Sequence, residues 1–556
     1  MFKLDSKYTA VFYIGLGMVF LYAFLVFFGM LSLIVKVPLT SYTAPVSVLF
    51  FVLIYPFYLK WYSNIEYKKG IFIALESLLV FTVCLWSVSS LHETLFDAIW
   101  YHHDAVYNLA KGWNPYERYL NKEETAYCHY YLNHFPIGNW VYGASIYLFT
   151  HTIEAAKGIS LAMIVASSFM LCGGMLEINF NWPKWKAVFI GLLVSLNPIS
   201  LLNIGSFYVD GSLAILLSLG ILFILVQIFG KDEKIWFPAM LVFALICHQK
   251  LTGTAYAAIF MFVFALLVIW KYKTSLRTWL FRFVMFVVIV VMGLGFHPFV
   301  SNTIDKGHPF FPAIENPEIN VFGGNNYPAN FIGLDRFEKF SIALYAEAGW
   351  IRTPDQTKMK APFTFDGLGN YGNGIPDIGA FGPLFQEVFT LALLIFILGL
   401  IFVKDKQFKW FAIVFACVIA ASFFVNREAY IFRYIPHFWL LTVFFASFLL
   451  EVKGWKWLSV LGLIALLFNV YRMEVKSLSA IREKTAQINS YLSTLKGNED
   501  QYLIDTGWAP SFKNRLGENG IDTSKLVWIS PTDTPYTEIP GSLGGKFKLR
   551  SALHQE

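Results

Sequence analysis

The chain has 556 residues, of which 56% are hydrophobic, 18% aromatic and only 14% charged. Soluble globular domains carry roughly 25% charged residues, so this composition excludes a soluble enzyme, a disordered chain and a fibrous repeat. The net charge of +6 does not indicate a nucleic-acid partner, because lysine and arginine collect in the cytoplasmic loops of membrane proteins. We therefore expect an all-α polytopic membrane protein.

Apolar segments close to 20 residues long recur along most of the chain, and such a segment can cross a bilayer as a helix. The first is expected to be retained, because the N-terminus lacks the short apolar region and cleavage site of a signal peptide. About thirteen transmembrane helices are expected, near 9–34, 42–59, 70–90, 158–177, 187–205, 211–229, 235–249, 253–270, 279–297, 384–403, 410–425, 435–450 and 456–470.

Basic residues are distributed unevenly between the loops that join these segments. One set of loops contains about eighteen lysines and arginines, whereas the short loops of the other set contain about four. The positive-inside rule then predicts a cytoplasmic N-terminus and, after an odd number of crossings, an outer C-terminus. We expect a multi-pass protein of the plasma membrane, or the inner membrane of a bacterial cell, that works on its extracytoplasmic side.

Three long polar segments share that outer side: 91–157, 298–383 and the tail. They are rich in Tyr, Trp, Phe and Pro, a composition typical of ordered loops close to a membrane. The tail combines a charged helical stretch with short apolar runs such as QYLID and LVWIS. We expect a transmembrane domain over 1–470, including both loops, and a small extracytoplasmic α/β domain over 471–556.

The first outer loop contains the segment LFDAIWYHHDAVYNLAKGWNPYERY, which is expected to be helical. On a helix, Asp97, Tyr101 and Asp104 lie on one face, with the two carboxylates about two turns apart. His102 and His103 flank them and, with Tyr101, are candidate substrate- or phosphate-binding residues. The pair can be read as an ordinary solvated helix face. In aromatic surroundings close to the membrane, however, a carboxylate can have a raised pKa and act as a general base.

A metal site is a third interpretation of this segment, because His and Asp are good ligands. The spacing matches no dedicated metal motif, so we assign no metal-ligating residue. No cofactor is required by the sequence, and a divalent cation stays an option.

The pattern DxxxYHxD at 97–104, followed by AVYNLAKGWNPY and HFPIGNW, resembles the first extracytoplasmic loop of GT-C superfamily glycosyltransferases. The shared features are an acidic pair after a membrane helix, an amphipathic helix, a G-x-N-P-Y turn at 112–116 and a P-x-G at 136–138. The specific match covers about fifty residues. The chain departs from many members in having three expected spans before this loop instead of one.

The resemblance implies an enzyme that takes a sugar from a polyprenyl-phosphate-linked donor. An acceptor hydroxyl would lose its proton to a carboxylate as it attacks the anomeric carbon, and the lipid phosphate would leave. Asp97 is the first choice for the base. Asp104 is the second choice, or it orients the acceptor.

Two further polar positions interrupt the apolar segments on the expected outer side. Asp210, in SFYVDG, is read either as a helix-capping residue in a tight turn or as a third carboxylate facing the same cavity. His248 and Lys250, both candidate substrate- or phosphate-binding residues, follow a run too short to span the hydrocarbon core. Lys250 is therefore expected to pair with a lipid-linked phosphate or to extend to the headgroups.

Arg427 and Arg433 lie on the outer side, against the charge rule, in the segment NREAYIFRYIP. Arginine binds phosphate through two hydrogen bonds, so both are candidate phosphate ligands, with Arg433 preferred. A salt bridge to Glu428 or binding of lipid headgroups is the alternative.

These features predict an inverting integral membrane glycosyltransferase. Its partners would be a polyprenyl-phosphate-sugar donor, an extracytoplasmic acceptor that is a glycan, glycolipid or protein, and membrane lipids. A lipid-linked polysaccharide polymerase or ligase is the first alternative. A lipid-glycan flippase or transporter is the second, although no internal half-repeat of the kind seen in transporters is present. The sugar, the acceptor, the carrier lipid and the oligomeric state are not indicated by the sequence.

Overall fold

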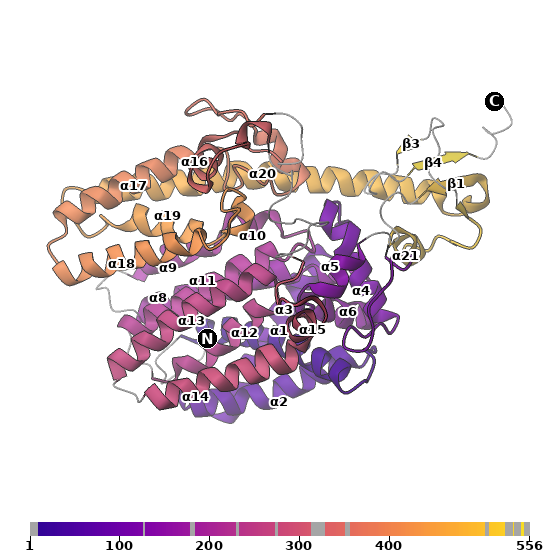
Figure 1. The fold of residues 1–556 in the computed structure, drawn as a ribbon, viewed down its shortest axis with the longest axis horizontal. Helices are drawn as coiled ribbons and strands as arrows, with labels where there is room; N and C mark the ends of the chain where they lie inside the picture. The colour runs from indigo at the N-terminus through magenta and orange to yellow at the C-terminus, as the bar shows by residue number, and fades with distance from the viewer. Residues whose placement is uncertain are drawn as a thin grey trace.

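The computed structural model describes residues 9–125, 128–177, 184–229, 233–272, 276–312, 328–350, 356–505, 511–528, 537–538 and 546–549. Within these ranges almost all regular structure is helical, and the named strands lie near the C-terminus (Figure 1). The expectation of an all-α polytopic architecture is confirmed at this level.

The first half of the chain forms a helical bundle and the first outer loop. Its elements are α1 (Ala10–Ile34), α2 (Thr43–Ser63), α3 (Tyr67–Val88), the π-helical turn η1 (Ala98–His102), α4 (His103–Ala110), α5 (His129–His134), α6 (Gly138–Thr150), α7 (Ile153–Ala156), α8 (Ile159–Glu177), α9 (Lys184–Ser195), α10 (Pro198–Leu202), α11 (Asp210–Phe229), η2 (Glu233–Ile235), α12 (Trp236–Cys247), α13 (Leu251–Tyr272), α14 (Leu276–Phe286), η3 (Val287–Leu294), η4 (Phe296–Val300) and α15 (Ser301–Lys306).

The second half contains the second outer loop, a further group of helices and the C-terminal domain. Its elements are η5 (Ala329–Phe331), α16 (Arg336–Tyr345), η6 (Leu368–Asn373), α17 (Phe385–Phe402), α18 (Lys406–Phe423), η7 (Phe432–Tyr434), α19 (Phe438–Ser447), α20 (Lys456–Leu495), η8 (Glu499–Gln501), β1 (Tyr502–Asp505), α21 (Phe512–Glu518), β2 (Val527–Trp528), β3 (Thr537–Glu538) and β4 (Lys546–Leu549).

Every apolar segment predicted to span the membrane contains helix, but the helices differ in length. Among the described residues, ten helices are long and apolar enough to cross a membrane. The segments 187–205, 235–249 and 435–450 contain shorter helices, and the first of them is interrupted before Pro198, where the Asn197 side chain caps α10. The protein therefore has the expected membrane-embedded character, while the count of thirteen crossings and their direction stay predictions.

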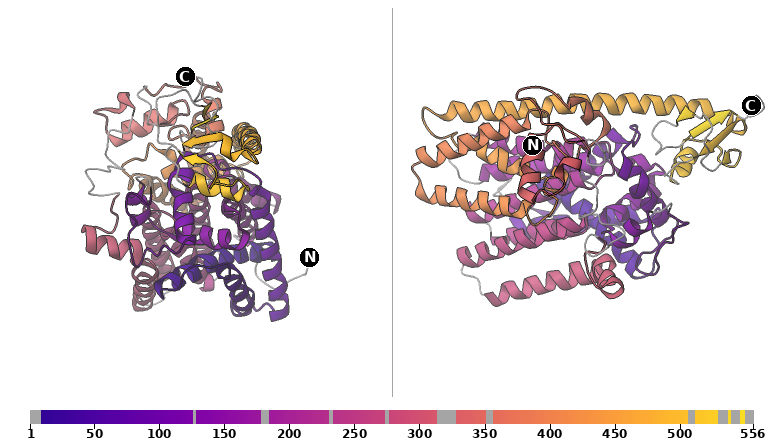
Figure 2. Two further views of the ribbon diagram at one scale, coloured as in Figure 1. Left: turned by 90° about the vertical axis from the view of Figure 1, so that its right-hand side faces the viewer. Right: turned by 45° about the horizontal axis from the view of Figure 1, so that its top comes forward.

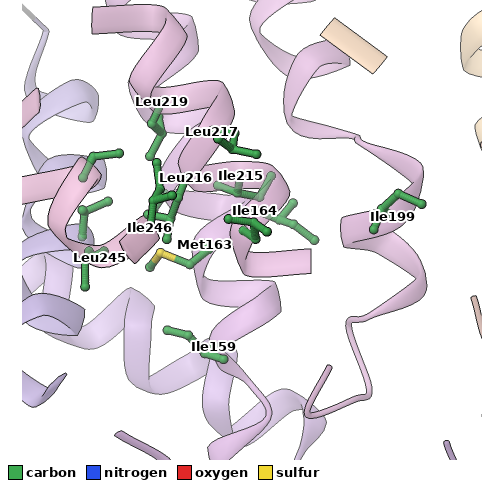
Figure 3. Packing of buried hydrophobic residues seen from close by; sticks show 14 of the residues in the cluster. Ile159, Met163, Ile164, Ile199, Ile215, Leu216, Leu217, Leu219, Leu245 and Ile246 are labelled. Carbon is green, nitrogen blue, oxygen red and sulfur yellow. The ribbon is translucent and has the colours of Figure 1, made fainter. Parts of the chain in front are cut away.

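The core lies where α11 packs against α8, α12 and α13. Helix α11 is apolar on all sides, which is typical of a helix buried within a bundle. Figure 3 shows aliphatic side chains from α8, α11 and α12 meeting in this region, among them Met163, Leu216 and Ile246. All three are completely buried, so α11 is a fixed centre around which the other helices are arranged.

The outer helices of the bundle expose apolar side chains instead of burying them. Trp86 of α3 is 76% exposed and Phe281 of α14 is 66% exposed. Large apolar side chains at such positions are costly in water and favourable in lipid. This distribution suits a bundle surrounded by a bilayer.

Helix α20 contains 40 residues, which corresponds to about 60 Å and is twice the thickness of a hydrocarbon core. Its first part packs against α17 and α19. Its second part extends past the bundle and reaches the C-terminal strands (Figures 1 and 2). The expected domain boundary at 470 therefore falls inside a continuous helix.

The C-terminal domain, defined here as the described residues after α20, contains a small sheet and α21. The sheet has the strand order β2-β1-β4-β3. Strands β1 and β2 are parallel, whereas β4 runs antiparallel to both β1 and β3. The domain lies at the same end of the molecule as α4, α5 and α6 of the first outer loop (Figure 1), so these two parts share one face of the bundle.

The predicted orientation can be tested by labelling cysteines. Glu123→Cys in the first outer loop and Lys406→Cys at the start of α18 place thiols at exposed positions, in a background that lacks the five native cysteines. In intact cells a membrane-impermeant maleimide is expected to label position 123 and not position 406, because the positive-inside rule puts them on opposite sides. Both should react after lysis. Labelling of position 406 alone in intact cells would show that the protein has the opposite orientation in the membrane.

Candidate active site

Segments that are distant in the sequence enclose a cavity of about 90 Å³ at the end of the bundle where α11 begins. Its wall comes from η1, α5, α6, the start of α11, the turn between α12 and α13, and η7. The lining residues are Asp97, Trp100, Tyr101, His102, Tyr131, Phe135, Pro136, Trp140, Val209, Asp210, Gln249, Lys250, Leu251, Thr252, Arg433 and Tyr434.

Six of these lining residues are candidates from the sequence, and the fold brings them together from four separate regions of the chain. Three regions lie between apolar helices and one lies in the first outer loop. The six are Asp97, Tyr101, His102, Asp210, Lys250 and Arg433.

Asp97 directly precedes the π-helical turn η1, and its carboxylate faces a cation. Its Oδ2 accepts a hydrogen bond from Arg433 Nη1 at 3.3 Å. Its backbone N–H donates to the Tyr208 hydroxyl, also at 3.3 Å. The Asp97 side chain is 14% exposed, so the carboxylate is largely shielded but reaches the cavity.

Arg433 is held between two carboxylates. Its Nε lies 3.0 Å from Asp377 Oδ1, and its Nη1 contacts Asp97. The guanidinium also lies 5.5 Å from the centre of the Tyr208 ring. Burial lowers the pKa of Arg433, but Asp377, Tyr434 and Asp97 together raise it well above its ordinary value. Arg433 is therefore a permanent positive charge in the wall of the cavity.

Asp377 is the principal residue that the sequence analysis did not single out. It lies in the second outer loop, in GNGIPDIGAFG, and its carbonyl accepts a hydrogen bond from the Phe432 backbone N–H at 3.0 Å. The second loop thus positions both the side chain of Arg433 and the turn that carries it. The signal for Asp377 was indirect, since an outer-side arginine needs an acidic partner.

Glu428, the alternative partner considered for the outer arginines, lies in the same region. It is 8% exposed. Burial, with the nearby charge of Asp377, raises the pKa of Glu428 to about 8. A carboxyl group in this state is mostly protonated at neutral pH and neutralises little of the charge of Arg433.

Lys250 and Asp210 form an ion pair in the wall of the cavity. Lys250 Nζ donates to Asp210 Oδ1 at 2.7 Å, and the two side chains are 20% and 2% exposed. The ammonium group also lies 4.1 Å from the centre of the Tyr434 ring. Burial lowers the pKa of Lys250, and the Asp210 carboxylate opposes that shift. Asp210 lies in the first turn of α11, where a negative charge is favourable. Its carboxylate therefore stabilises the N-terminus of α11 and also lines the cavity.

His102 presents a neutral imidazole to the cavity. Trp140 Nε1 donates to His102 Nδ1 at 2.7 Å. Because an indole N–H can only donate, Nδ1 is the acceptor and the ring proton is on Nε2. Burial lowers the pKa of His102 to about 4, against the opposing charges of Asp97 and Asp210. His102 is therefore a neutral hydrogen-bond donor at physiological pH.

The structure separates Asp104 from Asp97, although both were expected on one helical face. Residues 98–102 form a π-helical turn, in which hydrogen bonds run from residue i to i+5 and the angular spacing of side chains changes. Asp97 lines the cavity, whereas Asp104 is only 5% exposed and accepts a weak hydrogen bond from Cys128 Sγ at 3.7 Å. Burial raises the pKa of Asp104 to about 7.

Three other sequence candidates lie outside the lining of this cavity. His103 is completely buried and packs edge-on against Phe207, with 4.8 Å between ring centroids. His248 Nε2 lies 3.1 Å from the carbonyl oxygen of Val290. Arg427 is exposed. We therefore give none of the three a direct role in this cavity.

The cavity combines acidic and basic groups in surroundings rich in Tyr and Trp. In its lining, Asp97 and Asp210 provide carboxylates, and Lys250 and Arg433 provide cations that can bind an anion. Asp377 lies outside the lining and contacts the cavity residue Arg433. Among the residues that the structure describes, no group of three or more His, Cys, Asp or Glu side chains has a metal-binding arrangement. The site is suited to acid–base chemistry next to an anionic group.

A much larger groove, of about 1040 Å³, lies between α8, α9, α11, α13, α18 and α19. Its lining is mainly apolar and extends to Phe229 and Trp270, at the ends of α11 and α13 distant from Asp210. Such a surface suits lipid chains. The two carboxylates in its lining have structural partners, since Asp405 caps α18 and Glu451 pairs with Lys186.

The chain was compared with protein-family models, with curated proteins and with solved structures, and none of them matches it.

The Asp210–Lys250 pair can be tested with a double-mutant cycle. Asp210→Asn and Lys250→Met each leave one buried charge without its partner, so each should destabilise the protein. The double variant is expected to lose about 1–3 kcal/mol less than the sum of the two single losses. Unfolding in detergent micelles measures this difference. Strict additivity of the single effects would show that the ion pair contributes nothing.

The raised pKa of Asp104 predicts that the stability of the protein depends on pH. The pKa of about 7 in the folded protein exceeds the value of about 4 for an unfolded chain. The protonated group therefore contributes stability that is complete below pH 4 and is lost as the pH rises through 7, by at most about 4 kcal/mol. Asp104→Asn stays neutral, so its unfolding midpoint should rise relative to wild type between pH 5 and 8.

Glu123→Gln, at an exposed position, is the control for loss of one negative charge from the same loop. Parallel pH profiles for wild type and Asp104→Asn would contradict a buried, protonated Asp104.

Proposed function

We propose that the protein is an inverting integral membrane glycosyltransferase. It transfers a sugar from a polyprenyl-phosphate-linked donor to a glycan, glycolipid or protein acceptor on the extracytoplasmic side. The observation that carries this proposal is the contact between Asp97 and Arg433 in a cavity that also contains Asp210 and Lys250. Asp97 can accept a proton, and Arg433 and Lys250 in the same cavity can bind a phosphate.

In the proposed reaction Asp97 accepts the proton of the acceptor hydroxyl as its oxygen attacks the anomeric carbon. The bond between that carbon and the phosphate oxygen breaks, and the lipid phosphate leaves with the electron pair. A single displacement of this kind inverts the anomeric configuration and needs no enzymic nucleophile. A carboxylate and a clamp for the phosphate are sufficient.

Arg433 and Lys250 form that clamp. Each is already paired with a carboxylate, at 3.3 Å for Arg433 with Asp97 and at 2.7 Å for Lys250 with Asp210. An arriving phosphate competes with Asp97 for Arg433, while Asp377, 3.0 Å from Arg433 Nε, keeps the guanidinium in place. The exchange releases Asp97 Oδ2 from its ion pair and makes it a stronger base. Cations fixed in a desolvated wall also stabilise the charge on the leaving phosphate.

Access favours Asp97 over Asp104 as the base. A general base must come within hydrogen-bonding distance of the proton that it removes. Asp97 lines the cavity, whereas Asp104 is buried beside Cys128. Asp104 therefore acts in this proposal through the packing of the first outer loop.

A lipid-linked polysaccharide polymerase or ligase is the second candidate. The observation in its favour is the pair of cavity cations together with neutral His102, because such an enzyme relies more on outer Arg and His residues than on a carboxylate. A flippase or transporter is a weaker candidate, and product formation in detergent without a gradient would exclude transport as the main role.

The base is tested by Asp97→Asn, which keeps the shape and removes the basic carboxylate. Transfer from a polyprenyl-phosphate sugar is expected to fall by about 10²–10⁴-fold in kcat, with a small change in donor KM. Asp104→Asn is the matched control and should retain most of the activity. Full activity of Asp97→Asn would refute the assignment, and the same assay with EDTA decides whether a divalent cation takes part.

The two transferase classes are separated by a second variant, Arg433→Met. In the proposed mechanism both Asp97→Asn and Arg433→Met lose activity, the second also with a raised donor KM because a phosphate ligand is missing. Loss of activity in Arg433→Met, with Asp97→Asn unaffected, would favour the polymerase or ligase.

A further inference from the structure

The C-terminal domain packs directly behind the turn that presents Asp97. Ile99 in η1 is completely buried, and it belongs to a hydrophobic core that also contains Leu495 at the end of α20 and Leu516 of α21. The Ser511 hydroxyl donates a hydrogen bond to the Ile99 carbonyl at 3.1 Å. The π-helical turn therefore has the cavity on one side and the C-terminal domain on the other.

Contacts continue along the first outer loop on both sides of Asp97. Upstream, the His92 backbone N–H donates to Thr485 Oγ1 at 3.1 Å, and His92 Nε2 lies 2.8 Å from Asn489 Oδ1, both on α20. Downstream, the Tyr107 hydroxyl donates to Glu518 Oε1 at 2.6 Å. The segment that contains Asp97 is thus attached to α20 and α21 at several points.

A buried charge network fixes the same interface. Glu154 accepts from Arg515 Nη2 at 2.9 Å, from Lys157 Nζ at 2.8 Å, and from the Glu93 backbone N–H at 3.1 and 3.2 Å. The side chains of Arg515 and Glu154 are only 5% and 7% exposed. Hydrogen bonds between charged groups are strong, so Arg515 anchors α21 to Glu154 at the end of the first outer loop. The Glu93 backbone N–H joins Glu154 to the start of the same loop.

We propose that the C-terminal domain is a positioning element of the reaction centre, in which Ser511 and Arg515 hold the turn 98–102 so that Asp97 stays in contact with Arg433. The inference rests on the proposed function, since it concerns the placement of the proposed base. Arg433 is fixed by η7 and Asp377, whereas Asp97 belongs to the outer loop. The 3.3 Å contact between them therefore depends on support from behind the loop.

The mildest test is Ser511→Ala, which removes the hydrogen bond to Ile99 and little volume. A displacement of a reacting group by about 1 Å can reduce the rate by about 100-fold, so kcat is expected to fall by about 10- to 100-fold. Donor KM should change little, because Arg433 and Lys250 are untouched. Ser493→Ala, at an exposed position on α20, is the matched control and should leave kcat unchanged.

A second pair of variants tests the charge anchor. Arg515→Met removes the cation, while Arg515→Lys keeps a positive charge next to Glu154 and is expected to restore part of kcat. Hydrogen exchange of residues 95–104 gives a readout that does not depend on catalysis. It should accelerate in Ser511→Ala and Arg515→Met and stay unchanged in Ser493→Ala, with the unfolding midpoint of Ser511→Ala close to that of wild type.

The possible results separate this inference from the proposed function. Faster exchange together with lower kcat supports both. Unchanged exchange and unchanged kcat in Ser511→Ala and Arg515→Met would overturn the positioning role. If exchange accelerates but the wild-type protein transfers no sugar, the domain supports the turn and the proposed function is wrong.

Discussion

The arrangement of the cavity depends on the burial of one guanidinium between two carboxylates. Arg433 contacts Asp97 from the first outer loop and Asp377 from the second, so three segments distant in sequence converge on one cation. A buried charge without a partner is strongly destabilising, and this penalty fixes the relative positions of both loops and η7. The pairing with two carboxylates accounts for an arginine in a segment that the positive-inside rule predicts to be on the side where basic residues are rare.

The second pair, Lys250 with Asp210, repeats this principle elsewhere in the lining of the cavity. Both cations are matched by carboxylates in the structure, so the cavity is electrostatically satisfied without a ligand. An anionic ligand has to replace existing ion pairs and does not simply fill an unoccupied charge. In the proposed reaction, a phosphate that binds Arg433 displaces Asp97, so binding of the donor and release of the proposed base occur together.

Sequence reasoning located the membrane helices and most of the polar cavity wall, because both depend on composition and on charges at unusual places. Asp97, Asp210, Lys250 and Arg433 are conspicuous for that reason. The pairing of Asp97 with Asp104 on one face was not reproduced, since a π-helical turn cannot be recognised from the regular helical period used for the prediction. Asp377 was missed because an aspartate in a loop rich in glycine and proline looks ordinary until its partner is known. The short helices α9, α10, α12 and α19 likewise reflect tertiary packing more than local hydropathy.

The continuity of α20 has a mechanical consequence. A helix of 40 residues that leaves the bundle without a break is a rigid connection between the bundle and the C-terminal domain, unlike a flexible linker. Helix tilt responds to bilayer thickness at a cost of fractions of a kcal/mol per Å of mismatch. Because Tyr491 and Leu495 at the distal end of α20 share a core with Ile99, a change of tilt is transmitted to the outer loop and is not absorbed by a flexible joint. The thickness of the surrounding lipid would thereby be linked to the geometry of the loop that carries Asp97.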